Sequence, residues 1–552
     1  MIDLGFVNMS ANDPKFFGFT EFLSGLALMV LAWTIGDIRY RFRIRTAPVP
    51  LYNITFYSMA LLGLLTLMTD LWRAQEWPVL TGPVSPAVWQ ATLGLIFLLV
   101  FLLWALFAFI RPPFYGKRNA KRYTQILYQT ILNASPEELA VVADELKYSV
   151  PNIINFGQQR SRSFPGESKQ TKIKDVEAYA NTILDLIGDP RFCRAMVASA
   201  NRTIQSIFQQ ITKTQKYELP MHAFAKNLIL EAMNNRDSFL FHEIARFDSG
   251  LLGQVRPVTS TIFKNIEVVK GNPSLLTLDG VKMSKWDAEQ WAAYSRIALL
   301  SLEDYAAKGF QHKPNIFWKV TSNLADAVSD LPQLNGVETL DWDQGPLSKL
   351  RAVTSFIKEA IKILNKYPVP EGIKSRVEDI RNYTLYDYFA KLMFEVVHSS
   401  AYIKSPRSTC WTIQHNGIWS ELFTFGDHDC AASKIIHFKF RRLVYNEIND
   451  MKESVNFKGA RILGYCLNVM GHKLEDDSLH PHNALHRAIL AWTVKKYGWV
   501  HFKNPEVARY CLVEEWSYDE GNSRLVFSRP AGGLRTQPIH YYIDVNRYVP
   551  PN

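Results

Sequence analysis

Three long apolar stretches follow one another near the N-terminus. The third is the most apolar: from Leu93 to Ile110, fourteen of eighteen residues are Leu, Ile, Phe or Val, and none is charged. At roughly −0.4 kcal/mol for each of the fourteen, membrane insertion is favoured by about 6 kcal/mol. A helix of this length can cross the hydrocarbon core of a bilayer. The pattern predicts transmembrane helices over about 17–38, 52–71 and 89–110.

Basic residues are concentrated in the segments that follow the first and third apolar stretches, and neither segment contains an acidic residue. Because Lys and Arg beside membrane helices remain on the cytoplasmic side, we expect the N-terminus outside and the rear of the chain in the cytoplasm. The expected location is the plasma membrane or a bacterial inner membrane. These side chains also suit anionic lipid headgroups, so we predict a contact with the bilayer surface. The basic residues concerned are Arg39, Arg41, Arg43, Arg45, Arg111, Lys117, Arg118, Lys121 and Arg122.

The rear of the chain has the start and stop signals of many helices. Ser135-Pro-Glu-Glu138 has the form of a capping box, in which Ser and Glu each bind a free backbone N–H of the first turn. In Gly188-Asp-Pro190, Gly ends one helix and Asp-Pro opens the next. Ser284 with Asp287 opens another helical pattern. The cytosolic region is therefore predicted to be rich in α-helix.

Two further segments bear on the domain organisation. Residues 331–345 are polar and interrupt the helical pattern, and short strand patterns over 524–528 and 539–545 predict a small C-terminal β-hairpin. The expected fold is mainly α, with three transmembrane helices, a large α-rich cytosolic region and this hairpin. The expected domains are a transmembrane region (1–116), a first cytosolic domain (117–335) and a second one (346–552).

Charge and cysteine content narrow the class of protein. Residues 117–552 contain 55 Lys or Arg against 46 Asp or Glu, which permits attraction to phosphates but specifies no nucleic acid. We therefore do not expect specific nucleic-acid binding. The five cysteines are widely spaced and form no C-x-x-C pair, as is usual for reduced thiols in the cytosol.

The common catalytic motifs are missing from the sequence. It contains no phosphate-binding loop, dinucleotide fingerprint, H-E-x-x-H or G-x-S-x-G. One group of residues offers an alternative, because nine of the thirteen histidines lie at or after His415. His482 and His486 are four residues apart, a spacing that puts two imidazoles on one helix face, and His428-Asp429 could complete a site for a divalent metal.

Three functional hypotheses remain open. The first is a membrane-anchored sensor, effector or interaction module without catalysis or cofactor, which binds a protein partner or self-associates. One version of it is an oligomer that disturbs the membrane in stress or virus defence. The second is a membrane-anchored hydrolase that uses a metal at His428, Asp429, His482 and His486. The third is a transporter or channel subunit.

Overall fold

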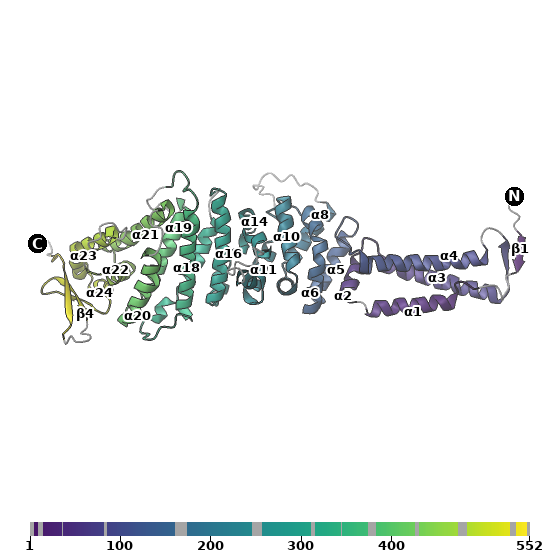
Figure 1. The fold of residues 1–552 in the computed structure, drawn as a ribbon, viewed down its shortest axis with the longest axis horizontal. Coiled ribbons are helices and arrows are strands. Elements are labelled where there is room, and N and C mark those ends of the chain that lie inside the picture. The colour runs from purple at the N-terminus through teal and green to yellow at the C-terminus, as the bar shows by residue number, and fades with distance from the viewer. Residues whose placement is uncertain are drawn as a thin grey trace. The chain divides into compact units, whose positions relative to one another are not determined.

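The computed structural model describes residues 5–8, 15–35, 37–81, 85–159, 174–245, 257–310, 315–343, 345–373, 382–424, 430–472, 483–529 and 537–548. Helices account for 72% of the described residues, so the predicted mainly-α class is confirmed. The chain divides into two compact units, and Figure 1 shows the order of their elements. The first unit is Met1–His242 with Val255–Ile262, and the second is Glu243–Gln254 with Phe263–Asn552.

The first unit begins with a short strand and a group of apolar helices, after which come the helices α5 to α11 of a helical domain. Its elements are β1 (Gly5–Asn8), α1 (Phe19–Ile35), α2 (Ile38–Thr46), α3 (Leu51–Ala74), β2 (Pro78–Thr81), α4 (Pro86–Ala105), the π-helix η1 (Leu106–Ile110), α5 (Ala120–Asn133), α6 (Pro136–Glu145), η2 (Leu146–Tyr148), α7 (Val150–Phe156), α8 (Asp175–Leu186), α9 (Pro190–Ser199), α10 (Asn201–Thr214) and α11 (His222–Asn234). Helices α12 (Phe239–Ala245) and α13 (Pro257–Phe263) lie where the chain passes between the units.

The second unit is helical until its last strands. Its elements are α14 (Ile266–Gly271), η4 (Pro273–Leu275), α15 (Gly280–Met283), α16 (Ala288–Ala307), α17 (Asn315–Ala327), η5 (Leu331–Leu334), α18 (Gly345–Asn365), α19 (Leu385–Ser400), α20 (Arg407–Trp411), the π-helix η7 (Thr412–Thr424), α21 (Ala431–Asn449), η8 (Asp450–Lys452), α22 (Phe457–Met470), α23 (Asn483–Lys503), α24 (Pro505–Tyr510), β3 (Trp516–Asp519), β4 (Arg524–Arg529) and β5 (Ile539–Asp544).

Two helices of the described chain are long and apolar enough to cross a membrane, not the three that were predicted. They are α3, with 24 residues, and α4 continued by η1, with 25. Helix α1 has 17 residues. At 1.5 Å per residue it spans about 26 Å, which is short of a hydrocarbon core of about 30 Å. The predicted first span is shorter because Asp37, at its expected end, instead caps the separate helix α2.

The two membrane-length helices present apolar side chains outward. Only 22% of the apolar window of α3 and 17% of that of α4 with η1 are buried. The core helix of a soluble protein would be mostly covered, whereas these helices leave a contiguous apolar surface that calls for lipid or another protein chain. The exposed side chains include Leu61, Leu64, Leu67, Leu95, Leu98, Leu99 and Leu102.

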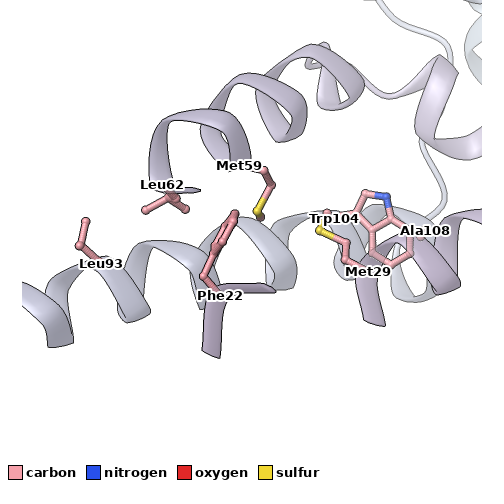
Figure 2. Packing of buried hydrophobic residues seen from close by; sticks show 7 residues of the cluster. All are labelled: Phe22, Met29, Met59, Leu62, Leu93, Trp104 and Ala108. Atoms are coloured by element: carbon pink, nitrogen blue, oxygen red, sulfur yellow. The ribbon is translucent and has the colours of Figure 1, made fainter. Parts of the chain in front are cut away.

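Helices α1, α3 and α4 pack together as a bundle around a small core. Figure 2 shows this core, which consists of Phe22, Met29, Met59, Leu62, Leu93, Trp104 and Ala108. Aromatic rings of neighbouring helices pack against glycines of this bundle. A Cβ atom on Gly63 would lie 2.8 Å from Phe22, and one on Gly25 would lie 2.6 Å from Phe97. These glycines therefore allow close helix packing within one chain.

The predicted helix starts after the apolar helices are confirmed at two places. Ser135 accepts from the backbone N–H of Glu138, and Glu138 accepts from that of Ser135, which completes the capping box of α6. Asp189 caps α9. Asp287 caps α16, so this helix begins three residues later than the predicted start at Ser284. In each case a side-chain oxygen binds a backbone N–H that has no partner inside the helix.

The C-terminal sheet has three strands rather than the two of the predicted hairpin. The order is β3-β4-β5, and both pairs are antiparallel. Strand β3 was missed because its four residues are too short for a clear alternation of apolar and polar positions. Asp519 at its end accepts from the N–H of Asn522, which helps to form the turn into β4.

The polar segment 331–345, predicted as a domain boundary, lies inside the second unit. Helices α16 and α18, on its two sides, pack against each other. The proposed limits 117–335 and 346–552 stay a prediction, which independent expression of the two pieces would test.

We expect Gly63→Leu to destabilise the apolar bundle, because the new side chain would have to displace Phe22. Overpacking of this kind typically costs about 1–3 kcal/mol. The measurement is the thermal unfolding midpoint in detergent. Ala60→Leu is the matched control, since Ala60 lies on the exposed side of the same helix. Equal effects of the two substitutions would contradict the packing described here.

Candidate functional site: the junction of the apolar helices with the helical domain

Helix α2 lies between the apolar helices and the helical domain. It packs against α3 and η1 on one side and against α5 and α6 on the other. Asp37 caps its first turn, and Pro48 and Pro50 follow soon after its end. Its buried residues are Phe42, Arg43 and Thr46. A short, strongly basic helix thus places one arginine side chain in the interior.

The end of α4 leaves a buried carbonyl oxygen without its usual helical partner. In an α-helix, the carbonyl of Ala108 would accept from the N–H of residue 112, but this residue is Pro and has no N–H. The last turn widens into the π-helix η1, where the N–H of Arg111 binds the carbonyl of Leu106 at 2.7 Å. Arg43 supplies the missing donor: its Nη1 lies 3.1 Å from the carbonyl oxygen of Ala108.

The same guanidinium group binds the carboxylate of Glu145 with two hydrogen bonds. Nε lies 2.7 Å from Oε2, and Nη2 lies 2.8 Å from Oε1. Glu145 is the last residue of α6, and both side chains are more than 90% buried. This hydrogen bonding raises the pKa of Arg43 above its usual range. Arg39 adds a second positive charge, with Nε 3.3 Å from Glu145 Oε1.

Breaking this pair would be costly. A buried ion pair contributes little net stability compared with apolar residues, but removal of one partner strands the other charge and costs about 3–5 kcal/mol. The end of α4 and the end of α6 therefore cannot separate from α2 without a large penalty. Arg43 thus connects the end of an apolar helix to a helix of the helical domain.

The segment that follows η1 is also fixed to the helical domain. Tyr115 is fully buried; its N–H binds the Ser149 hydroxyl at 3.0 Å, and its own hydroxyl donates to the carbonyl of Val176. Asn119 donates to the carbonyl of Thr46 at 2.6 Å, which ties this segment back to α2. These hydrogen bonds fix the segment between the apolar helices and α5, which is therefore not a flexible linker.

Aromatic contacts support the junction on both sides of α2. The ring of Tyr40 lies 4.6 Å from that of Phe109 in η1, and the ring of Phe42 lies 5.7 Å from that of Tyr123 in α5. Such pairs add about 0.5–1.5 kcal/mol each beyond their buried area. Alternate residues of α2 therefore contact different neighbours.

The nine predicted membrane-surface residues fall into three groups. Arg43 is buried in the ion pair, which leaves it unable to meet a headgroup, while Arg39 and Arg122 are half-buried. The exposed ones are Arg41, Arg45, Arg111, Lys117, Arg118 and Lys121. The exposed apolar side chains of Ile110 and Phe114 lie beside them in the sequence. A lipid contact stays a prediction for the exposed residues.

The residue that sequence reasoning missed is Glu145. It lies 102 positions from Arg43, and no spacing rule joins two residues so far apart. One signal was present in the sequence, because Pro112 directly follows an apolar helix. Proline has no backbone N–H, so a carbonyl of the preceding turn needs a donor from elsewhere in the chain.

The predicted metal site is only partly within the described residues. His428, Asp429 and His482 lie outside them. His486 is buried in α23, and its Nε2 donates to the carbonyl of Gly471 at 3.1 Å. In the part of the chain that the structure describes, no group of three or more His, Cys, Asp or Glu residues is placed to hold a metal ion. The metal hypothesis stays a prediction.

We expect Glu145→Ala to lower the thermal unfolding midpoint of the detergent-purified protein by at least about 5 °C, because it leaves Arg43 buried without its counter-charge. The double variant Arg43→Ala/Glu145→Ala should lose less than the sum of the two single variants. The control is Arg45→Ala, at an exposed position of the same helix. Additive effects, or a control as damaging as Glu145→Ala, would disprove the coupling.

A comparison with protein-family models and with curated proteins finds no match for this chain. Its function is therefore inferred from its own residues and contacts.

Proposed function

We propose that the protein is a membrane-anchored, non-catalytic effector whose cytosolic helices transmit a signal to its membrane helices through α2. The observation that carries this proposal is the Arg43 guanidinium group, which binds the end of α4 and the end of α6 at once. A passive tether needs no such connection, since a flexible linker keeps a domain near a bilayer equally well.

The proposed topology places α2 and the exposed basic residues at the cytoplasmic face. Two features favour it. The basic residues occur at one end of the apolar helices, and strand β1 of the N-terminal arm pairs with β2 in the link between α3 and α4. The arm and the link therefore share the other end of the apolar helices, and we propose that the link between α3 and α4 is outside the cell.

The surface that is available for self-association in the membrane is the exposed apolar one. Three helices make a small bundle. Aromatic rings of the same chain already pack against Gly25 and Gly63, so these positions are not open to a second copy. Further association would use the outward faces of α3 and α4. An assembly whose bundles shift when the cytosolic domain moves could open a leak, and this is the membrane-disturbing activity that we propose.

The two other hypotheses are not favoured by a specific contact. The hydrolase depends on residues of which three lie outside the described part of the chain. For a transporter, the acidic candidates are Asp70 and Glu21, and both lie close to Lys15 at the end of the bundle, with Asp70 at 3.0 Å and Glu21 at 3.8 Å.

We expect a cysteine at Gln75 to react with a membrane-impermeant maleimide in intact cells, and a cysteine at Lys117 to react only after permeabilisation. The two positions are exposed and lie at opposite ends of the α3–α4 pair. Cys430, the one half-buried native cysteine among the five, would be replaced by Ser in both variants. The reverse labelling pattern would overturn the proposed topology.

We expect strong expression of the full chain to depolarise the cell membrane, and the detergent-purified protein to have the mass of an oligomer. Arg43→Ala should reduce the depolarisation at equal membrane abundance, whereas Arg45→Ala should leave it unchanged. A voltage-sensitive dye and light scattering coupled to gel filtration provide the measurements. A strict monomer that causes no depolarisation would reject this function and leave a passive anchor.

A further inference from the structure

Two cationic side chains of the second unit converge on one tyrosine ring. Lys404, in the segment after α19, has its Nζ 4.3 Å from the centre of the Tyr510 ring at the end of α24. The guanidinium carbon of Arg461, near the start of α22, lies 4.9 Å from the same centre and 4.0 Å from the centre of the Tyr402 ring. Arg509 directly precedes Tyr510 and is exposed. We call Lys404, Arg461 and Arg509 the cation cluster.

The fold brings the cation cluster together from three segments. Helices α22 and α24 pack against each other (Figure 1). Gly464, one turn after Arg461, makes this possible, because a Cβ atom there would lie only 3.1 Å from a backbone oxygen just after α24. Asn335 accepts from the backbone N–H of Lys404 at 2.7 Å, and Lys404 Nζ donates to the carbonyl of Tyr510 at 3.4 Å. Backbone contacts therefore fix the place of the cluster.

The cation cluster has no bound counter-charge in the described part of the chain. None of its three side chains forms an ion pair with a carboxylate of those residues. Two carboxylates of neighbouring segments are bound to other cations: Glu515 lies 2.7 Å from Arg407, and Glu395 lies 3.6 Å from Lys458. Like charges that are held close together repel one another. A bound anion would relieve this repulsion.

The donors of the cluster remain within reach of a ligand. Arg461 is half-buried, yet its guanidinium nitrogens keep contact with solvent, and they have no acceptor among the described residues. Its contacts with the two rings use the face of the guanidinium group, whereas the N–H groups lie in its plane. Burial lowers the pKa of Lys404, and the positive charges of Arg461 and Arg509 lower it further. An anion beside Lys404 would oppose both effects.

A phosphate group matches this arrangement. It carries a charge of about −1.5 to −2 at neutral pH and three strong acceptor oxygens. A guanidinium group suits such an oxyanion because its N–H donors form a rigid fork, and an ammonium group adds a compact positive charge. A carboxylate has one charge and two oxygens, so it would satisfy the cluster less fully. A metal cation would be repelled by three positive charges.

We propose that the cation cluster binds the phosphate group of a small molecule, with Arg461 and Lys404 donating to its oxygens and Arg509 adding positive charge. Such a group occurs in free phosphate compounds and in lipid headgroups. The site goes beyond the proposed membrane function and does not depend on it. Calorimetry measures phosphate binding, whereas depolarisation measures the membrane activity, so each can fail alone.

Calorimetric titration of the full-length protein in a non-ionic detergent tests this proposal, with inorganic pyrophosphate as the probe. We expect a dissociation constant of about 1 mM or lower at low salt, which should rise with ionic strength. Malonate is the matched probe, since it also joins two anionic groups through one bridging atom. It should bind at least about tenfold more weakly, because it offers carboxylates in place of phosphates.

A second phosphate probe distinguishes the two sources of the group. Dihexanoyl phosphatidate is a short-chain lipid that ends in a phosphate monoester. Tighter binding of this lipid than of pyrophosphate would identify a lipid headgroup as the ligand, and weaker binding would identify a free phosphate compound. Binding of neither phosphate probe, or equal binding of malonate and pyrophosphate, would overturn the proposal.

Three variants locate the binding at the cation cluster. Arg461→Gln and Lys404→Gln each remove a charged donor and should weaken pyrophosphate binding at least about tenfold. Arg509→Gln should weaken it about threefold, since an exposed charge acts through solvent and is screened by salt. Because Arg509 is exposed, its replacement tests the site even where Arg461→Gln prevents folding.

Arg351→Gln is the matched control. Arg351 also lies over an aromatic ring, with its guanidinium carbon 5.9 Å from the centre of Trp342, but it is paired with Asp343 at 3.1 Å. Its replacement should leave pyrophosphate binding unchanged. Unchanged binding in both Lys404→Gln and Arg509→Gln would place the ligand elsewhere and reject the site.

Discussion

The buried guanidinium group of Arg43 is the interaction on which the junction of this protein depends. A charge in the interior must be paired and hydrogen-bonded, because its removal from water is otherwise far too costly. Arg43 meets this requirement with three hydrogen bonds to two partners, the carboxylate of Glu145 and the carbonyl of Ala108. Its position is therefore determined by helices on both sides, and those helices are held in turn by the arginine.

The need for this arginine begins with the end of α4. A membrane helix must satisfy its backbone groups internally, because the hydrocarbon offers neither donors nor acceptors. Pro112 prevents that at Ala108, at the point where the helix leaves its apolar stretch. An ordinary helix end would turn such a carbonyl toward water. Here the carbonyl is buried, so a donor from α2 replaces water and joins the helix end to the domain that follows.

Hydropathy predicted α3 and α4 closely, because an uninterrupted apolar stretch has few alternatives to a buried or membrane-spanning helix. It predicted a first span that was too long, because composition alone did not show that Asp37 would cap a new helix. Capping residues such as Ser135 and Asp189 gave correct helix starts because their effect is local. Strand β3 escaped notice because four residues carry too little pattern.

Most of the junction could not be predicted in this way. The sequence marked Arg43 as one of nine equivalent basic residues, and only the packing of α2 against α6 distinguishes it from its exposed neighbour Arg45. From charge alone, all nine residues are predicted to attract anionic lipid headgroups. Burial reverses this for one of them, because a guanidinium group held by Glu145 is no longer available to a headgroup.

The packing of the apolar helices also limits how copies of the protein can associate. Small residues often mark the surfaces through which membrane helices pair. In this bundle Gly25 and Gly63 accommodate Phe97 and Phe22 of the same chain, so these two positions are already occupied within one bundle. What remains for a second copy is the leucine-rich outer surface, which lipid also satisfies. Association through such a surface gains little over lipid contact, and an assembly held in this way would be weak enough for a movement of α2 to change it.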